Sequence, residues 1–313
     1  MDVDLNSLEC PFCKTPHPKI RYKYENCAIV KCQKCGLMWL FPRPEDDEIY
    51  EVYGDIQYYF NQDFFTKDGS KIYGYVDYLA ERINKQYWYK KIIQKTKSII
   101  QNDSLSKERK YSWLDVGCGL GFCMDVAYDY GFEVSGIEFN LPAVQYIRSK
   151  YTFPVEYGKL DEIQITRKYD VVSMFDVIEH LTDPIADLRK LREMISDDGC
   201  LLIQTMDSES FVSRLLGKRL EDFRRFREHL FFFSRDSLKQ ILEQCGWEIY
   251  EIRSIGQTFK VSALVDRFAV YSKFLSKFIK GLIHPKWLLE ANIYVNPGTK
   301  MMIYARPKKG SLE

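Results

Sequence analysis

"YSWLDVGCGLGFCMD", residues 111–125, joins a short apolar run to a helix-like pattern through three closely spaced glycines. Gly117, Gly119 and Gly121 let the backbone turn tightly and approach a ligand closely. Their G-x-G-x-G spacing differs from the G-x-G-x-x-G fingerprint of dinucleotide-binding proteins. The next apolar run ends at Glu138, so a parallel sheet would bring this carboxylate beside the glycine turn. The two features predict a nucleotide-binding edge at which Glu138 accepts hydrogen bonds from two ribose hydroxyls.

Apolar runs and helix-like patterns alternate from residue 111 to residue 255. The predicted strands are "YSWLDVG", "FEVSGIE", "YDVVSMFD", "CLLIQTM" and "WEIYEIRSI". "TDPIADLRKLREMISDDG" predicts a helix with Asp183 as N-cap and Pro184 at its first position, and its apolar face includes Ile195. "SRDSLKQILEQCG" predicts another helix, capped by Ser234 or Asp236. This alternation indicates an α/β fold, with a parallel sheet covered by helices on both faces.

Four segments carry a resemblance to a known family: "LDVGCGLG" with the later "GIE", "YDVVSMFDVIEHLTDP", "DDGCLLIQT" and "KMMIYARP". Together they resemble the motifs of the class I S-adenosylmethionine-dependent methyltransferases. The resemblance implies a Rossmann-like, seven-stranded sheet whose antiparallel last strand is "KMMIYARP". "DVIEHL", "EHLFFFS" and "CGLMWLFPRP" are similar to a subgroup found in sugar and cell-surface polysaccharide biosynthesis. That subgroup often begins with two cysteine knuckles.

The resemblance also implies which residues contact the cofactor. Asp115 and the glycine turn would hold its amino acid part, and Glu138 would hold its ribose. Phe175 and Asp176 would flank the cofactor and the reacting centre. The full set of implied cofactor positions is Asp115, Gly117, Cys118, Gly119, Gly121, Glu138, Phe139, Leu160, Phe175 and Asp176. Cys118 is interpreted as a small turn residue rather than a redox centre.

One position departs from the family pattern. After the third strand the family often has Gly-Asp, whose acid contacts adenine, whereas this chain has Lys159 there. The backbone of Leu160, or Asp161, would substitute for that contact.

Two histidines follow predicted strands near the expected reaction centre. Methyl transfer from a sulfonium is an in-line displacement, in which the enzyme chiefly aligns the nucleophile with the methyl group. A hydroxyl nucleophile also needs a base, and histidine is suited to that role near neutral pH. His180 in "IEHL" and His229 in "REHL" are the candidate bases, with Asp176 as a further catalytic candidate. Each histidine has a purely structural alternative.

A second hypothesis for the same residues is a divalent cation site. Some ubiquinone-pathway and small-RNA 2′-O-methyltransferases have a comparable acid-x-x-Glu-His pattern. The resemblance implies that Asp176, Glu179, His180 and His229 gather Mg²⁺, which would polarise vicinal hydroxyls.

The nine cysteines include two tight pairs near the amino terminus. "CPFC" contains Cys10 and Cys13, "CQKC" contains Cys32 and Cys35, and 18 residues separate the pairs. Four thiolates on two such turns form a closed tetrahedral zinc site, which is structural rather than catalytic. The alternative is four unrelated thiols. The cysteine pattern indicates a reducing compartment, and we expect a cytoplasmic protein.

Candidate substrate contacts lie on both sides of the glycine turn. Guanidinium groups in "GKRLEDFRRFREHL" would grip a phosphate of a sugar nucleotide, or else form a solvated helix face. Tyrosines in "YGYVDYLAER" would form a lid or stack on a sugar, or pack in the core. These candidates are Tyr73, Tyr75, Tyr78, Arg224, Arg225 and Arg227. The basic amphipathic stretch 263–290 fits an interfacial membrane helix, a homodimer contact or a lid.

The predicted organisation is a cysteine domain over 1–43, a helical tyrosine-rich segment over 44–110 and a methyltransferase domain over 111–313, with a helical insertion at 256–298. The leading function is O-methylation of a sugar-linked or other small hydroxylated substrate. The alternatives are a keto-sugar C-methyltransferase, an RNA methyltransferase and a non-catalytic binding module. A net charge of +1 argues against nucleic acid, because phosphate contacts dominate that affinity.

Overall fold

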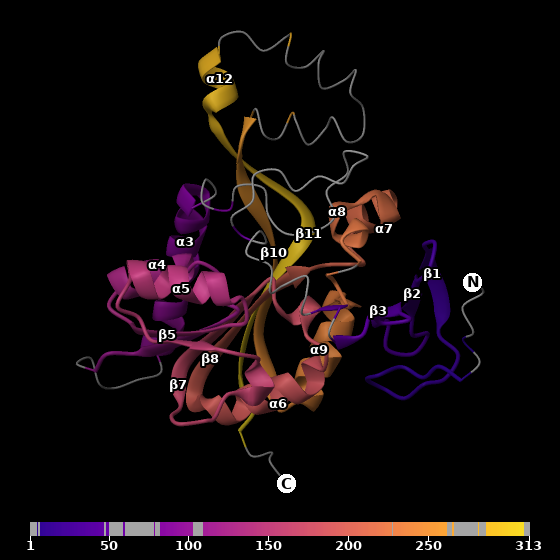
Figure 1. Ribbon diagram of the computed structural model, residues 1–313, viewed down its shortest axis with the longest axis horizontal. Coiled ribbons are helices and arrows are strands. Elements are labelled where there is room, and N and C mark those ends of the chain that lie inside the picture. The colour runs from indigo at the N-terminus through magenta and orange to yellow at the C-terminus, as the bar shows by residue number, and fades with distance from the viewer. Residues whose placement is uncertain are drawn as a thin grey trace.

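A seven-stranded mixed sheet forms the centre of the computed structural model (Figure 1). The structure describes residues 5, 7–46, 48–49, 59, 78, 82–102, 109–226, 228–261, 265, 281 and 286–309. The strand order is β10-β11-β8-β7-β4-β5-β6, and β11 runs antiparallel to both of its neighbours. The strands are β4 (Ser112–Val116), β5 (Glu133–Glu138), β6 (Val155–Tyr157), β7 (Tyr169–Phe175), β8 (Ile195–Met206), β10 (Trp247–Lys260) and β11 (Asn292–Pro307). The seven-stranded α/β fold expected from the sequence is confirmed.

Helices cover both faces of the sheet, since most residues of β4, β5 and β7 are buried on both sides. On one face lie α3 (Arg82–Asn102), α4 (Phe122–Asp129) and α5 (Leu141–Lys150). On the other lie α6 (Pro184–Met194) and α9 (Arg235–Gln244). Two separate clusters of buried apolar side chains follow from this arrangement, one beneath each set of helices.

Side-chain caps fix the starts of the two helices that the sequence predicts. Asp183 accepts hydrogen bonds from the backbone of Ile185 and Ala186, and Pro184 stands at the first turn of α6. Ser234, rather than Asp236, caps α9 by accepting from Ser237. The predicted end of α6 was too late, because the chain already enters β8 at Ile195.

The cysteine-bearing amino terminus forms a small antiparallel sheet beside α6 and α9 (Figure 1). Its order is β1-β2-β3-β9, where β1 is Lys19–Lys23, β2 is Ala28–Lys31, β3 is Met38–Phe41 and β9 is Phe231–Phe232. The fourth strand, β9, belongs to the part of the chain between β8 and α9 of the main domain. The small sheet is therefore hydrogen-bonded directly to the larger domain.

Strands β10 and β11 extend beyond the main sheet as a paired ribbon, with α12 (Lys286–Glu290) near its far end (Figure 1). Residues 256–260 and 292–298 are strand, so both ends of the stretch 256–298, where a helical insertion was expected, belong to this ribbon. Most of 262–285 lies outside the described residues. Among the helices that the structure describes, none is long and apolar enough to span a membrane.

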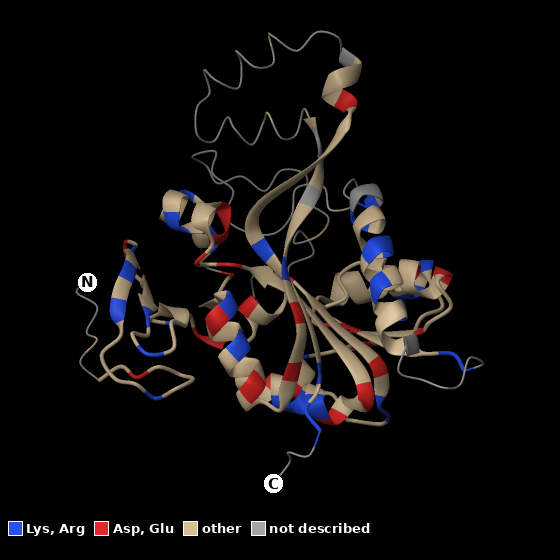
Figure 2. Ribbon diagram, turned by 180° about the vertical axis from the view of Figure 1, so that it is seen from behind, with Lys and Arg blue, Asp and Glu red and all other residues tan. Residues whose placement is uncertain are grey.

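Basic residues are spread along two separate elements. Helix α3 carries lysines and an arginine but no acid, and β1 carries Lys19, Arg21 and Lys23. These elements lie on opposite sides of the molecule (Figure 2), so their charges do not share one surface.

Short helices complete the described chain between the strands. They are the 3-10 helices η1 (Leu160–Glu162), η2 (Ile178–His180) and η3 (Gly217–Arg219), and the α-helices α7 (Phe211–Leu216) and α8 (Glu221–Arg224).

Candidate functional site

The glycine turn connects β4 to α4 at the carboxyl edge of the sheet. Gly117, Gly119 and Gly121 all have left-handed φ angles, of 68°, 56° and 78°. The carboxylate of Glu138, at the end of β5, accepts a hydrogen bond of 2.6 Å from the Gly119 N–H and one of 2.8 Å from the Asn140 N–H. Burial raises the pKa of Glu138 to about 7. The structure therefore joins the two features on which the predicted ribose contact depends.

Gly117 has the tightest surroundings of the three glycines. A Cβ there would lie 2.5 Å from Cγ2 of Val177, on a backbone with φ of 68°. We expect Gly117→Ala to lower the free energy of unfolding by about 2–4 kcal/mol, combining left-handed strain with overpacking. Gly131→Ala is the control, because φ is 89° and no atom lies within 4 Å of its added Cβ. Equal losses for both variants in urea unfolding would contradict the steric part of this prediction.

Asp115 lies buried near the carboxyl end of β4. Its Oδ1 accepts a 2.5 Å hydrogen bond from the Ser173 hydroxyl, and Ser173 in turn accepts one from the Trp113 indole. Burial raises the pKa of Asp115 to about 7. Cys118 is also buried, and desolvation raises its thiol pKa well above the ordinary value, as expected for a turn residue rather than a reactive thiol.

The other implied cofactor residues lie in different surroundings. Phe139 stacks on Tyr157, with ring centroids 6.3 Å apart, whereas Leu160 is buried in the core under α6 and α9. Phe175 contacts Trp88 and Tyr89 of α3.

Tyr78, predicted as a substrate contact, lies at the glycine turn. It stacks on Phe122 with centroids 5.4 Å apart, and its hydroxyl is 3.2 Å from the position of a Cβ on Gly119. Its surroundings are thus those of the predicted cofactor edge. Tyr73 and Tyr75 lie outside the described residues.

Asp176 has a charged partner that the sequence did not reveal. Its Oδ1 accepts a 2.7 Å hydrogen bond from Lys300 of β11, and its Oδ2 accepts one of 2.7 Å from Gln204. Burial alone would raise the pKa of Asp176, but Lys300, Lys85 and Gln204 hold it below its usual value. Asp176 also has a left-handed φ of 56°, a strained geometry that clusters at functional sites. A lone lysine opening the apolar strand "KMMIYARP" was the available sequence signal.

The structure brings His180 and His229 together. Their ring centroids are 4.8 Å apart, and they form a group with Glu179 whose nearest ligand atoms all lie within 4.8 Å of one another. Oε2 of Glu179 and Nδ1 of His229 are buried and have no hydrogen-bond partner among the described residues. Asp176 is not part of this group. Three of the four residues of the predicted cation site therefore converge.

One hydrogen bond sets the tautomer of His180. Its Nδ1 lies 2.9 Å from the carbonyl oxygen of Glu228, which can only accept. Nδ1 therefore carries the proton, and Nε2 carries the lone pair of the ring. Burial lowers the pKa of His180 to about 4 and lowers that of His229 well below its ordinary value, so both rings are neutral at pH 7. Burial also raises the pKa of Glu179 to about 8, with Asp176 adding to the effect.

Of the three arginines predicted to bind a phosphate, one already has a buried partner. Arg225 forms an ion pair and hydrogen bonds with the fully buried carboxylate of Glu228. Arg224 is exposed at the end of α8, and Arg227 lies outside the described residues. Arg225 therefore supports the loop that holds His180 through Glu228.

The four predicted metal-binding cysteines gather in one cluster. The Sγ atoms of Cys10 and Cys35 are 3.6 Å apart, and those of Cys13 and Cys32 are 3.5 Å apart. A zinc–sulfur bond of about 2.3 Å in a tetrahedron requires sulfurs about 3.8 Å apart, so the donor set fits zinc. The backbone N–H groups of Lys34 and Cys35 point at the Cys32 sulfur, as befits a thiolate.

A family model described as "Methyltransferase domain" matches residues 86–252. The mitochondrial ubiquinone biosynthesis O-methyltransferase of Schizosaccharomyces pombe is 29% identical over 156 residues, covering 45% of this chain and 57% of that protein. The ubiquinone biosynthesis O-methyltransferase of Dinoroseobacter shibae is 27% identical over 152 residues, with coverages of 43% and 59%. The chain thus spans less than two thirds of the length of either relative.

Among solved structures, the plantazolicin methyltransferase BpumL in complex with SAH matches with a TM-score of 0.48 and 14% identity. The match covers 84% of this chain and 97% of that one.

Proposed function

The chain belongs to the class I S-adenosylmethionine-dependent methyltransferases, and from this premise we propose that it methylates a hydroxyl of a small acceptor beside His180. The observation that carries the proposal is the hydrogen bond from His180 Nδ1 to the Glu228 carbonyl. It leaves the lone pair on Nε2, on a neutral ring beside the carboxyl ends of β7 and β8. The relatives named as O-methyltransferases support a hydroxyl as the nucleophile.

In this proposal the chain's residues align the reactants and accept one proton. Glu138 and the glycine turn hold S-adenosylmethionine, which supplies an electrophilic methyl group. The acceptor oxygen attacks that methyl in line with the breaking carbon–sulfur bond, and its proton passes to Nε2 of His180. The products are the methyl ether and S-adenosylhomocysteine.

An acceptor screen tests the proposed reaction. Purified enzyme is incubated with S-adenosylmethionine and panels of catechols, phenols, nucleotide sugars and keto-sugars, and product mass and S-adenosylhomocysteine release are measured. Methyl ethers from hydroxylated acceptors are expected, and a sugar-linked acceptor is retained as one arm because the motifs suggest it. Turnover confined to carbon methylation of keto-sugars would overturn the proposal.

A second candidate mechanism adds a divalent cation at Glu179, His180 and His229. The buried Oε2 of Glu179 and Nδ1 of His229, which have no hydrogen-bond partner among the described residues, favour it. Two imidazoles and a carboxylate suit a transition ion such as Mn²⁺ or Zn²⁺ better than the Mg²⁺ suggested by the sequence. Such an ion would lower the pKa of an acceptor hydroxyl.

Chelation separates the two mechanisms. If the cation is used, stripped enzyme that keeps its cysteine-bound zinc should lose roughly tenfold or more in kcat, as in other metal sites. Added Mn²⁺ should restore the rate, but not in Glu179→Gln. Full turnover after chelation would exclude the cation and leave His180 acting alone.

We also propose that Cys10, Cys13, Cys32 and Cys35 hold structural zinc, with all four positions of the metal filled by thiolates. The division into a cysteine module over 1–43, a segment over 44–110 and a catalytic domain over 111–313 is part of this proposal. In the described structure β9 belongs by sequence to the catalytic domain but pairs with β3 of the cysteine module.

A further inference from the structure

A strand of the cysteine module pairs directly with β9, the short strand that follows His229. Strand β3 begins three residues after Cys35 and pairs antiparallel with β9, so that Met38 lies opposite Phe232 and Trp39 opposite Phe231. The partner strand is only two residues long. It is therefore held to the small sheet by very few backbone contacts, all of them adjacent to the proposed reaction centre.

Two backbone hydrogen bonds continue from β3 to both histidine loops. Leu40 N–H donates to the Leu230 carbonyl at 2.9 Å, and Leu230 N–H donates to the Glu179 carbonyl at 2.8 Å. Leu230 directly follows His229, and Glu179 directly precedes His180. The module, the His229 loop and the His180 loop thus form one hydrogen-bonded line.

A side chain adds a second link on the same side. Arg43, just after β3, donates from Nη1 to the carbonyl of Thr182 at 3.0 Å, two residues beyond His180. Apolar packing follows the same path, because Leu37 and Trp39 share a buried cluster with Ile178 and Leu230.

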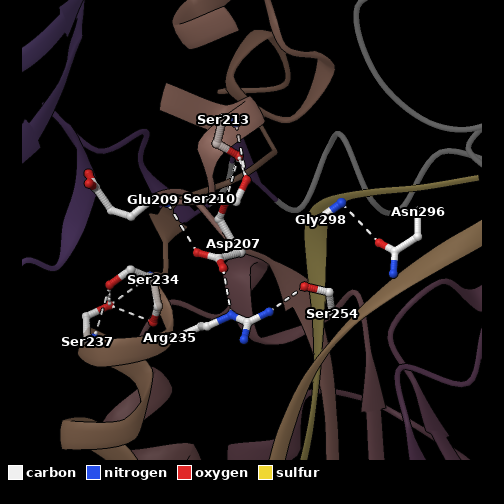
Figure 3. A network of polar contacts seen from close by, with 10 residues as sticks. All are labelled: Asp207, Glu209, Ser210, Ser213, Ser234, Arg235, Ser237, Ser254, Asn296 and Gly298. Atoms are coloured by element: carbon white, nitrogen blue, oxygen red, sulfur yellow. Dashed lines mark hydrogen bonds and ion pairs between the residues drawn. The ribbon is translucent and has the colours of Figure 1, made fainter. Parts of the chain in front are cut away.

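The far end of the His229 segment is held differently. Ser208 N–H donates to the Phe233 carbonyl, and Asp207 pairs with Arg235, which also donates to Ser254. Figure 3 shows this network around Asp207, which involves β10 and α9 of the main domain. The end beyond Phe233 is therefore fixed by the main domain alone, whereas the end at His229 is bonded through Leu230 both to β3 and to the His180 loop.

We propose that the four-cysteine module is a positioning element for the reaction centre, with Leu40 and Arg43 as its positioning residues. Metal binding orders the knuckle from which β3 emerges, since a module of this size gains most of its folding free energy from its metal. An ordered β3, through its hydrogen bonds to the two loops, then fixes the distances between His180, His229 and Glu179. The inference rests on the proposed function of His180.

The same structure predicts what the module does not control. The buried cluster around the glycine turn contains Cys118, Leu120 and Phe122, and its described members include no residue of the module. Cofactor affinity should therefore be insensitive to metal loss, whereas the positions of His180 and His229, and with them kcat, should change.

The test compares Cys35→Ser, which removes one zinc ligand, with Cys27→Ser, which leaves all four. The full chain has four histidines, so labelling histidine at Cε1 yields four assignable ring signals. In Cys35→Ser we expect the His180 and His229 signals to move or broaden, S-adenosylhomocysteine affinity to stay within about twofold and kcat to fall roughly tenfold or more. Cys27→Ser should match the wild type in all three.

Ring signals of His180 and His229 that superimpose in Cys35→Ser and Cys27→Ser would overturn the inference, whatever the acceptor proves to be. If Cys35→Ser fails to fold and loses cofactor binding, Leu40→Pro is compared with Lys19→Pro by the same criterion. Proline at Leu40 removes the N–H that bonds Leu230, whereas Lys19 begins an edge strand that tolerates proline. Loss of turnover with unchanged ring signals would contradict the positioning role while leaving the proposed chemistry intact.

Discussion

Glu138→Ala should weaken S-adenosylhomocysteine binding by about a hundredfold, or about 3 kcal/mol, because the proposed ribose contact consists of two hydrogen bonds to this carboxylate. The substitution also leaves the Gly119 N–H without its 2.6 Å acceptor, so the turn itself loses a contact. Isothermal titration calorimetry measures the dissociation constant directly. Glu133→Ala, at the other end of β5, is the matched control, because that exposed carboxylate pairs only with surface Arg167 in the described contacts. An unchanged affinity in Glu138→Ala would refute the ribose role.

The pH dependence of binding offers a finer test of the same carboxylate. Its pKa of about 7 means that Glu138 takes up a proton as the pH falls below 7 in the ligand-free enzyme. Since the ribose hydroxyls donate to the ionised form, proton and ligand compete, and affinity should fall as the pH drops from 8 to 5.5. The slope should approach about tenfold per pH unit below the pKa. Glu138→Gln should remove most of this pH dependence. The part that remains would come from Asp115, which has a similar pKa.

His180→Asn should lower kcat by roughly a hundredfold or more, the range expected for loss of a general base. Asparagine can still donate to the Glu228 carbonyl in place of Nδ1, so the loop keeps its hydrogen bond while the lone pair of Nε2 is lost. Cofactor affinity should be unchanged, because in the proposed reaction His180 acts on the acceptor and not on the cofactor. His17→Ala is the control, since that histidine is exposed in the cysteine module. A kcat in His180→Asn close to that of the wild type would leave His180 with a structural role only.

His229→Asn gives the complementary measurement. The ring of His229 is buried and 4.8 Å from that of His180. If the rate falls only in this variant, the base is His229, and the hydrogen bond of His180 serves to shape the loop. If both variants lose turnover while the chelated wild type keeps its full rate, the two rings act as a pair without a cation.

The sequence predicts the sheet, and the meeting of the glycine turn with Glu138, well because their signals are local. Each signal lies within the element that it predicts: three glycines in one turn, an acid at the end of the next strand, and capping residues at helix starts. The pairing of Trp39 with Phe231 has no such signal, since it joins strands almost two hundred residues apart in the chain. For the same reason Lys300 was missed as the partner of Asp176: only the antiparallel placement of β11 brings it there.

The arginine-rich segment was harder to interpret because composition does not reveal partners. Arg225 and Glu228 were both visible in the sequence, and the structure pairs them at a buried position. A guanidinium that neutralises a buried carboxylate is committed to the fold and is poorly placed to recognise phosphate. Arg224, which is exposed, remains a candidate for acceptor recognition.

The position of β11 between β10 and β8 has a consequence for biosynthesis. On the ribosome β11 emerges after the other six strands of the main sheet, so until then β8 presents an open edge and β10 has no neighbour in the sheet. Such unpaired edges favour association between chains. Lys300 reaches Asp176 only at this last step. Assembly of the sheet edge that carries Asp176 should therefore wait for synthesis of β11, and nascent chains arrested before residue 292 should be prone to aggregate.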